Sequence, residues 1–191
     1  MTKIALFGCS SVDGTPYGSE DPNIWPNTLA KELNMQLDNC FVGSGSNAAI
    51  FRKFCNYFRN NTADMCIVFW SFYMRSEVHM DETVYQITPG TKSFPGKYVQ
   101  KFYRNQNTDT YITDLQNKIW CVDEICYKNN ISVMQGSAFD IDFELKTSKH
   151  WFPNSLHSLI RNTTDCGHAQ IQDHSHIKDE IKNFIIDSKL I

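Results

Sequence analysis

The chain has 191 residues, of which 41% are hydrophobic and 20% charged, and its formal net charge is −3. This length fits one domain over residues 1–191, which would bury roughly 70% of the surface that the unfolded chain exposes. Lysine and arginine occur at most in scattered pairs, which argues against a nucleic-acid partner. No apolar run is long enough for a membrane span or a signal-peptide core, so we expect a cytoplasmic protein with no membrane partner.

Short apolar segments alternate with longer segments of helical periodicity, which indicates an α/β protein. We predict strands at 3–7, 35–42, 64–70 and 131–136, and helices at 24–33, 47–60, 108–129 and 174–188. The segment DMCIVFW (64–70) is almost entirely apolar, which is typical of a parallel strand covered on both faces. The pattern therefore predicts a mostly parallel sheet covered by helices.

Two segments show no clear period. Residues 76–107 contain proline, glycine and many aromatic residues, and we expect an irregular excursion from the core that caps a site. Residues 137–162 are also aromatic and irregular. The seven cysteines include no CxxC pair, which favours free thiols over a disulfide framework. Cysteines and histidines form no spaced ligand set, so we expect no metal.

The first predicted strand runs directly into a turn of small residues, FGCSSVDG (7–14). A turn after the carboxyl end of a parallel strand is where α/β proteins place ligand-binding groups. This position would expose Ser10 or Ser11 as a nucleophile. The alternative is structural, because serine also caps helices and closes turns.

The second predicted strand ends in VGSGSNAA (42–49). Its backbone amides are candidates for binding a developing oxyanion, with Ser44, Gly45 and Asn47 as the residues concerned. The same letters match G-x-G-x-x-A, so a nucleotide-binding loop is an alternative.

Near the end of the chain, TTDCGHAQIQDH (163–174) places Asp165 three residues before His168. A histidine that acts as general base for a serine needs a carboxylate on its other ring nitrogen to set its tautomer and orientation. One loop would supply both groups, in the chain order serine, aspartate, histidine. His174 and His176, at the start of the closing helix, are expected to be dispensable.

These motifs together resemble those of the SGNH (GDSL-like) hydrolase family. Gly8-Cys9-Ser10 is similar to the G-D-S block, NCFVGSGSN to the second block, and Asp165-Cys166-Gly167-His168 to the D-x-x-H block. The resemblance implies a three-layer α/β/α flavodoxin-like fold and a serine esterase without a cofactor. It implies catalytic roles for Ser10, Asp165 and His168. The oxyanion would be bound by the amides of Ser10 and Gly45, with Ser44, Asn47 or Ser71 as further candidates.

The sequence departs from the family pattern at two places. Cys9 replaces the aspartate of G-D-S, and SFYMRSE (71–77) follows the third strand where the family has G-x-N-D. The implied substrate is a small acyl ester, with an O-acetyl group on a carbohydrate as the leading candidate. Because the asparagine is missing and Cys9 replaces the aspartate, a catalytically weak or inactive SGNH-like module that binds a glycan or a protein is the alternative.

Overall fold

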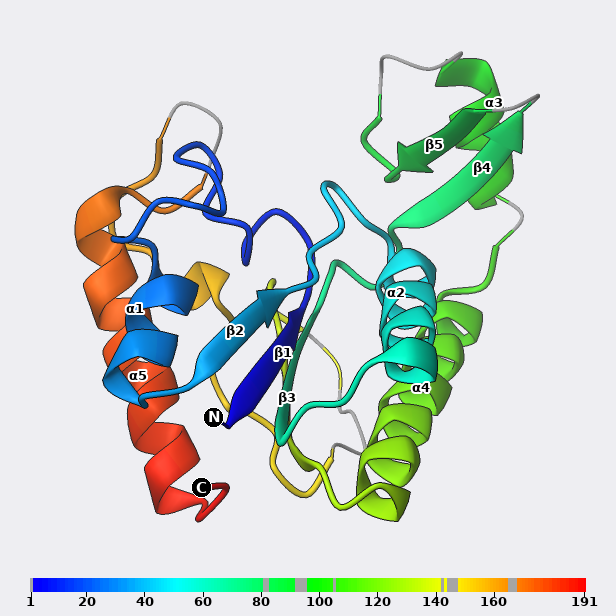
Figure 1. The fold of residues 1–191 in the computed structure, drawn as a ribbon. Coiled ribbons are helices and arrows are strands. Elements are labelled where there is room, and N and C mark those ends of the chain that lie inside the picture. The colour runs from blue at the N-terminus through cyan, green and yellow to red at the C-terminus, as the bar shows by residue number, and fades with distance from the viewer. Residues whose placement is uncertain are drawn as a thin grey trace.

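A sheet of four parallel strands forms the centre of the protein (Figure 1). The computed structural model describes residues 2–80, 83–91, 96–104, 106–141, 143, 148–164 and 168–191. The strands β1 (Lys3–Phe7), β2 (Gln36–Asn39), β3 (Met65–Trp70) and β6 (Ser132–Ser137) lie in the order β2-β1-β3-β6. All three pairings are parallel, so the carboxyl ends of the strands meet at one edge of the sheet. The predicted parallel sheet is confirmed.

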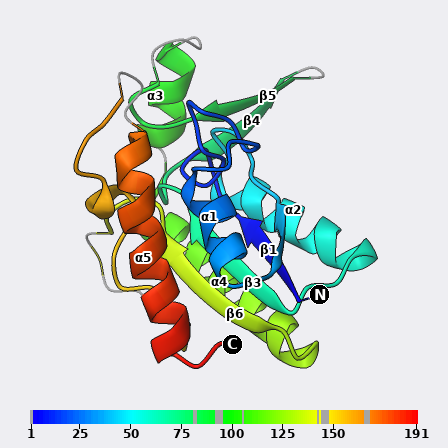
Figure 2. The same ribbon diagram turned by 60° about the vertical axis from the view of Figure 1, so that its left-hand side comes forward.

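Helices cover both faces of this sheet (Figures 1 and 2). The helices α1 (Trp25–Glu32) and α5 (Ile171–Asp187) lie on one face, and α2 (Asn47–Asn60) and α4 (Thr108–Lys128) on the other. The three-layer arrangement and its four helices are therefore as predicted. Helix α5 begins at Ile171 rather than at residue 174, because its first turn carries polar residues that hide the apolar period.

The core lies where the two central strands meet the helices. Every residue of β3 is buried, and β1 is buried from Ile4 onward, as expected for strands covered on both faces. The edge strand β2 is shorter than predicted and partly exposed, because it pairs with β1 alone. Between β6 and α5, the described residues contain only a short 3-10 helix (His157–Leu159) and isolated bridges such as Gln135 with Trp151. Among the described residues, no helix is both long and apolar enough to cross a membrane.

The prediction that residues 76–107 are irregular is wrong, whereas the expected departure of this segment from the main sheet agrees with the structure. The chain there forms an antiparallel hairpin of β4 (Ser76–Met80) and β5 (Thr83–Ile87), followed by α3 (Gly96–Arg104). The hairpin lies outside the main sheet, and the first three residues of β5 are exposed, so its apolar pattern does not reveal a buried face. The hydroxyl of Tyr103 on α3 lies 2.8 Å from the Met74 carbonyl oxygen and 2.9 Å from that of Ile87. Helix α3 therefore packs on the base of the hairpin.

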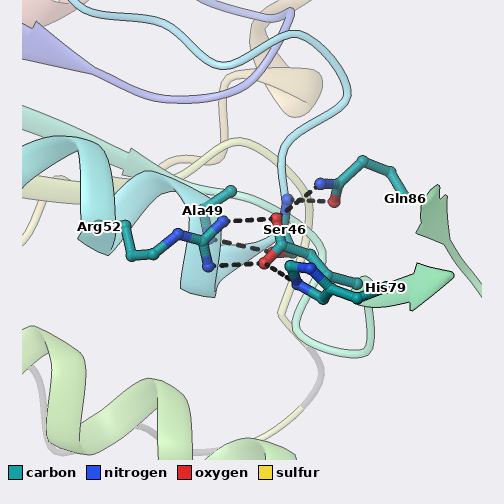
Figure 3. A network of polar contacts seen from close by, with 6 residues as sticks. Ser46, Ala49, Arg52, His79 and Gln86 are labelled. Atoms are coloured by element: carbon teal, nitrogen blue, oxygen red, sulfur yellow. Dashed lines mark hydrogen bonds and ion pairs between the residues drawn. The ribbon is translucent and has the colours of Figure 1, made fainter. Parts of the chain in front are cut away.

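A polar network joins this hairpin to the start of α2 (Figure 3). The guanidinium of Arg52 donates two hydrogen bonds, of 2.6 and 2.9 Å, to the carboxylate of Glu77. Gln86 donates to the same carboxylate and accepts the backbone N–H of Ser46 at 2.9 Å. The Ser46 hydroxyl in turn caps α2 by accepting the N–H of Ala49. The hairpin is thus attached to the loop that follows β2.

Candidate active site

The turn that carries Ser10 is attached to two neighbouring elements. It follows β1 directly, at the carboxyl edge of the sheet. The indole N–H of Trp25, from α1, donates to the Ser11 carbonyl oxygen at 3.3 Å. The side-chain amide of Asn39, at the end of β2, donates to the Val12 carbonyl oxygen at 3.1 Å. These contacts fix the backbone immediately after Ser10.

The turn also requires a glycine at position 8. A Cβ atom on Gly8 would lie 2.8 Å from both methyl groups of Val12 and 3.2 Å from the carbonyl oxygen of Phe69. Such contacts are too short for real side chains, so any larger residue would displace the turn. The next residue, Cys9, is fully buried, and its thiol contacts the Ser11 hydroxyl at 3.6 Å. A buried thiol therefore stands where the family pattern has an aspartate.

The structure brings His168 next to Ser10. The Nε2 atom of His168 lies 2.8 Å from the Ser10 Oγ atom. The loop around His168 is closed by a bridge between Thr163 and Ala169, and the Thr164 N–H donates to the His168 carbonyl oxygen at 2.8 Å. At this distance an imidazole can accept a proton from a serine hydroxyl. Asp165, the predicted third member of the catalytic triad, lies outside the described residues.

Asp173 supports the same loop from the first turn of α5. Its side chain is only 3% exposed, and it accepts the backbone N–H of Asn162 at 2.9 Å. The N–H of Gln170 donates to the Asn162 carbonyl oxygen, which closes the loop at its base. Sequence reasoning missed this role, although an acidic residue in the first turn of a helix is a recognisable signal.

Ser10 and His168 line a cavity of about 260 Å³. Its wall is partly apolar, with Phe139, Leu156, Ile160 and Ile177 among the lining residues. Of the predicted oxyanion-binding residues, Ser10 and Ser44 line this cavity, whereas Gly45, Asn47 and Ser71 are not part of its described lining.

The hydrogen bonds of these five residues differ. The Gly45 N–H donates to the Val42 carbonyl oxygen at 2.8 Å, and the Ser71 N–H donates to the Asn47 side-chain oxygen at 2.7 Å. The Asn47 amide also donates back to the Ser71 carbonyl oxygen. Within the described part of the chain, no internal acceptor is recorded for the backbone N–H of Ser10 or Ser44. Among the predicted residues, Ser10 and Ser44 are thus the two that line the described cavity and whose backbone N–H has no recorded acceptor among the described residues.

The expectation that His174 is dispensable conflicts with its position. His174 is 2% exposed and lines the cavity, and its Nδ1 atom accepts the backbone N–H of Trp25 at 3.2 Å. It thereby caps α1, whose N-cap residue Ile24 provides no side-chain acceptor. Burial lowers the pKa of His174, which favours the neutral imidazole. Because Nδ1 accepts the Trp25 N–H, the proton of the neutral ring is on Nε2. Sequence reasoning missed this contact because Trp25 and His174 are far apart in the chain.

Arg75 is a second residue that sequence reasoning did not select. It lies between β3 and β4, lines the cavity, and places its guanidinium 5.6 Å from the centre of the Phe139 ring. Its position just after the carboxyl end of a parallel strand is the signal that could have identified it.

The fold is similar to several solved structures, some of them of esterases, although no family model and no curated protein matches the sequence. TesA superposes with a TM-score of 0.65 at 9% identity, over 100% of both chains. The psychrotrophic esterase EstA from Pseudoalteromonas sp. has a TM-score of 0.60 at 10% identity, over 99% of each chain. AlinE4, an SGNH-hydrolase family esterase, has a TM-score of 0.50 at 12% identity, over 98% of this chain and 96% of its own.

The chain has the SGNH hydrolase fold. The likeness extends over nearly the whole chain, so it includes both the serine turn and the loop before α5. At about one identical residue in ten, it establishes the fold alone. In the SGNH fold of this protein, the Ser10 turn and the His168 loop lie at the same edge of the sheet.

Proposed function

We propose that the protein is a serine esterase that hydrolyses a small acyl ester. The observation that carries this proposal is the 2.8 Å distance between His168 Nε2 and Ser10 Oγ in the wall of a cavity. A serine with a histidine within hydrogen-bond reach is the arrangement that activates a hydroxyl nucleophile. The esterases among the similar solved structures support the same reaction class.

In the proposed mechanism, the Ser10 hydroxyl attacks the acyl carbonyl carbon while His168 Nε2 accepts its proton. The tetrahedral intermediate collapses, the alcohol oxygen leaves, and the His168 imidazolium returns the proton to it. A water molecule, activated by His168, then attacks the acyl-serine. The acid is released and the Ser10 hydroxyl is restored. Asp165 would orient His168 and stabilise the imidazolium, as the D-x-x-H motif predicts.

The amides of Ser10 and Ser44 are the proposed donors to the oxyanion. Both residues line the cavity, and neither amide has a recorded internal acceptor among the described residues. Gly45, Asn47 and Ser71 would act indirectly, since their hydrogen bonds shape the loops after β2 and β3. Preorganised amides of this kind each account for about 10²–10³ in turnover.

The size of the cavity favours a short acyl group. About 260 Å³ is below the range of roughly 300–1,000 Å³ that is usual for drug-sized ligands. An acetyl ester fits this limit. An O-acetyl group on a carbohydrate, the substrate that the family resemblance suggested, is therefore still the leading candidate substrate. The missing asparagine after β3 favours the second candidate, a non-catalytic SGNH-like module that binds a glycan or a protein through this cavity.

Labelling with a serine-directed fluorophosphonate tests the proposal. Mass spectrometry should find one adduct, on Ser10, and Ser10→Ala should remove it. His168→Ala should slow the labelling strongly, because Ser10 would lose its base. Hydrolysis of 4-nitrophenyl acetate, measured before and after chelator treatment, should depend on Ser10 and not on a metal. A folded protein without an adduct on Ser10 and without turnover would support the binding module instead.

A further inference from the structure

Arg75 is a cation in the proposed active site for which the described residues provide no charged partner. Its Nη1 atom is buried and has no hydrogen-bond acceptor among them. The ion pairs recorded for the described residues do not include it. A guanidinium that is partly withdrawn from water without an acceptor costs free energy, and the contact with the Phe139 ring compensates only in part.

The described wall of the cavity contains nothing that neutralises this charge. Arg75 is the one lysine or arginine among the described lining residues, and these include no aspartate or glutamate. His174, which lines the same wall, is kept neutral by burial. This part of the wall therefore presents a single permanent positive charge near Ser10 and His168.

The position of Arg75 is fixed by its neighbours in the chain. Its own N–H donates to the Phe72 carbonyl oxygen at 2.9 Å. On one side, the carbonyl of Met74 accepts the Tyr103 hydroxyl at 2.8 Å. On the other side, the Glu77 carboxylate accepts hydrogen bonds from Nη1 and Nη2 of Arg52. The backbone is fixed in this way and the guanidinium itself lies against the Phe139 ring, so fewer side-chain conformations are lost when it binds an anion.

We propose that Arg75 binds an anionic group of the substrate, so that the enzyme prefers short esters that carry a carboxylate or a similar oxyanion. This inference rests on the proposed esterase function. A guanidinium matches a carboxylate with two parallel hydrogen bonds, which gives both affinity and orientation. Because one small cavity contains Arg75 and the reacting pair, the anion must lie only a few bonds from the ester.

The test compares charged and neutral esters of similar shape. The first pair is 4-acetoxybenzoate and 4-acetoxybenzamide, in which the anion is on the alcohol side. The second pair is mono-4-nitrophenyl adipate and its primary amide, in which it is on the acyl side. The wild-type protein should prefer the anion in at least one pair by about 10- to 100-fold in kcat/KM, as expected for a hydrogen-bonded charge.

Arg75→Gln should lower kcat/KM for the preferred anionic ester by about 10- to 100-fold and for its neutral partner by less than about threefold. Arg75→Lys should retain part of the preference, since it keeps the charge without the planar fork. The matched control is Arg59→Gln, an exposed arginine at the end of α2, which should behave as wild type. Thermal unfolding of each variant checks that it is folded.

Equal losses for charged and neutral esters would overturn the proposal, because they would place Arg75 at the developing oxyanion instead. A wild-type protein without preference in either pair would also overturn it. If no ester is hydrolysed at all, the proposed function fails, and calorimetric binding of 4-acetamidobenzoate then tests the inference alone. An affinity at least tenfold weaker in Arg75→Gln would support the anion site, and an unchanged affinity or no binding would refute it.

Discussion

The Nε2 atom of His168 lies 2.8 Å from the Oγ atom of Ser10, although the two residues are 158 positions apart in the chain. The parallel sheet explains this approach, because the turn after β1 and the loop before α5 lie at the same edge. A nucleophile and its base act as one unit, so the consequences of removing either can be predicted together.

Ser10→Ala and His168→Ala should each reduce kcat on a small acetyl ester by about 10⁴-fold or more, and the double variant should lose little beyond that. The reason is that either change alone stops proton transfer from the nucleophile. Steady-state kinetics on the three variants measure this. Ser175→Ala and His176→Ala, on α5 outside the described cavity wall, are the controls and should retain most activity. Multiplicative losses in the double variant would show that the two residues do not act together.

Asp165→Asn should lower kcat by up to about 10⁴-fold, with KM little changed. The amide keeps the shape of the carboxylate, but it favours the wrong tautomer of His168 and leaves the imidazolium without its countercharge. The comparison with Asp179→Asn, a partly exposed aspartate on α5, controls for the change of net charge. If both variants keep wild-type kcat, the D-x-x-H motif has no catalytic role.

Gly8→Ala should destabilise the protein by about 1–3 kcal/mol and also reduce turnover. The added methyl would meet Val12 at 2.8 Å and the Phe69 carbonyl oxygen at 3.2 Å, so the Ser10 turn must shift. Urea unfolding and kcat report the two effects. Gly90→Ala is the matched control, since none of the described atoms lies within 4 Å of the position that its new methyl would take. A Gly8→Ala protein as stable and active as Gly90→Ala would contradict the crowding seen around this turn.

The pKa of His174 should make stability depend on pH. Burial lowers this pKa below the ordinary value of 6.5, whereas the nearby Asp173 and Asp21 act to raise it. Between the folded and unfolded pKa values, the unfolded chain binds more protons than the folded one. The contribution of His174 to the free energy of unfolding should therefore be fully present above about pH 7, and it should decrease as the pH falls through 6.5.

His174→Asn keeps an acceptor for the Trp25 N–H but removes the titration. Urea unfolding at about pH 7.5 and about pH 5.5 should show a smaller loss of stability on acidification for this variant than for the wild type. His176→Asn, which changes a histidine two positions along the same helix, should keep the wild-type loss. Identical losses in the wild type and His174→Asn would show that burial does not hold this imidazole neutral.

The Arg52–Glu77 pair should contribute to stability more than an ordinary surface pair. The Glu77 side chain is 7% exposed and receives two hydrogen bonds from Arg52. A double-mutant cycle with Arg52→Gln and Glu77→Gln should give a coupling of about 1 kcal/mol. The control cycle is Glu124 with Lys128, both at least 60% exposed on α4, where we expect a few tenths of a kcal/mol. A coupling no larger than the control would mean that this pair does not anchor the hairpin.

Much of the architecture follows from local patterns in the chain. The predicted helix at 47–60 coincides with α2, and the apolar segment at 64–70 contains β3, because these periodicities arise from contacts with one continuous core. Ser10 and His168 were predicted as a nucleophile and its base because serine and histidine stand here in short recognisable motifs, and the structure places the two side chains 2.8 Å apart. The hairpin of β4 and β5 was not predicted. The first three residues of β5 are exposed, so they show no apolar pattern, and Glu77 on β4 pairs with Arg52 on the distant helix α2.

Only the tertiary structure decided which residues surround the serine. Arg75 and His174 belong to unremarkable polar segments, yet both line the cavity with Ser10. His174 is buried because its partner, the N–H of Trp25, lies 149 positions away, and Arg75 is placed by a hairpin that a distant helix holds. Burial and hydrogen bonding of a side chain depend on segments that meet only after folding, and a linear pattern of residues contains no measure of those contacts.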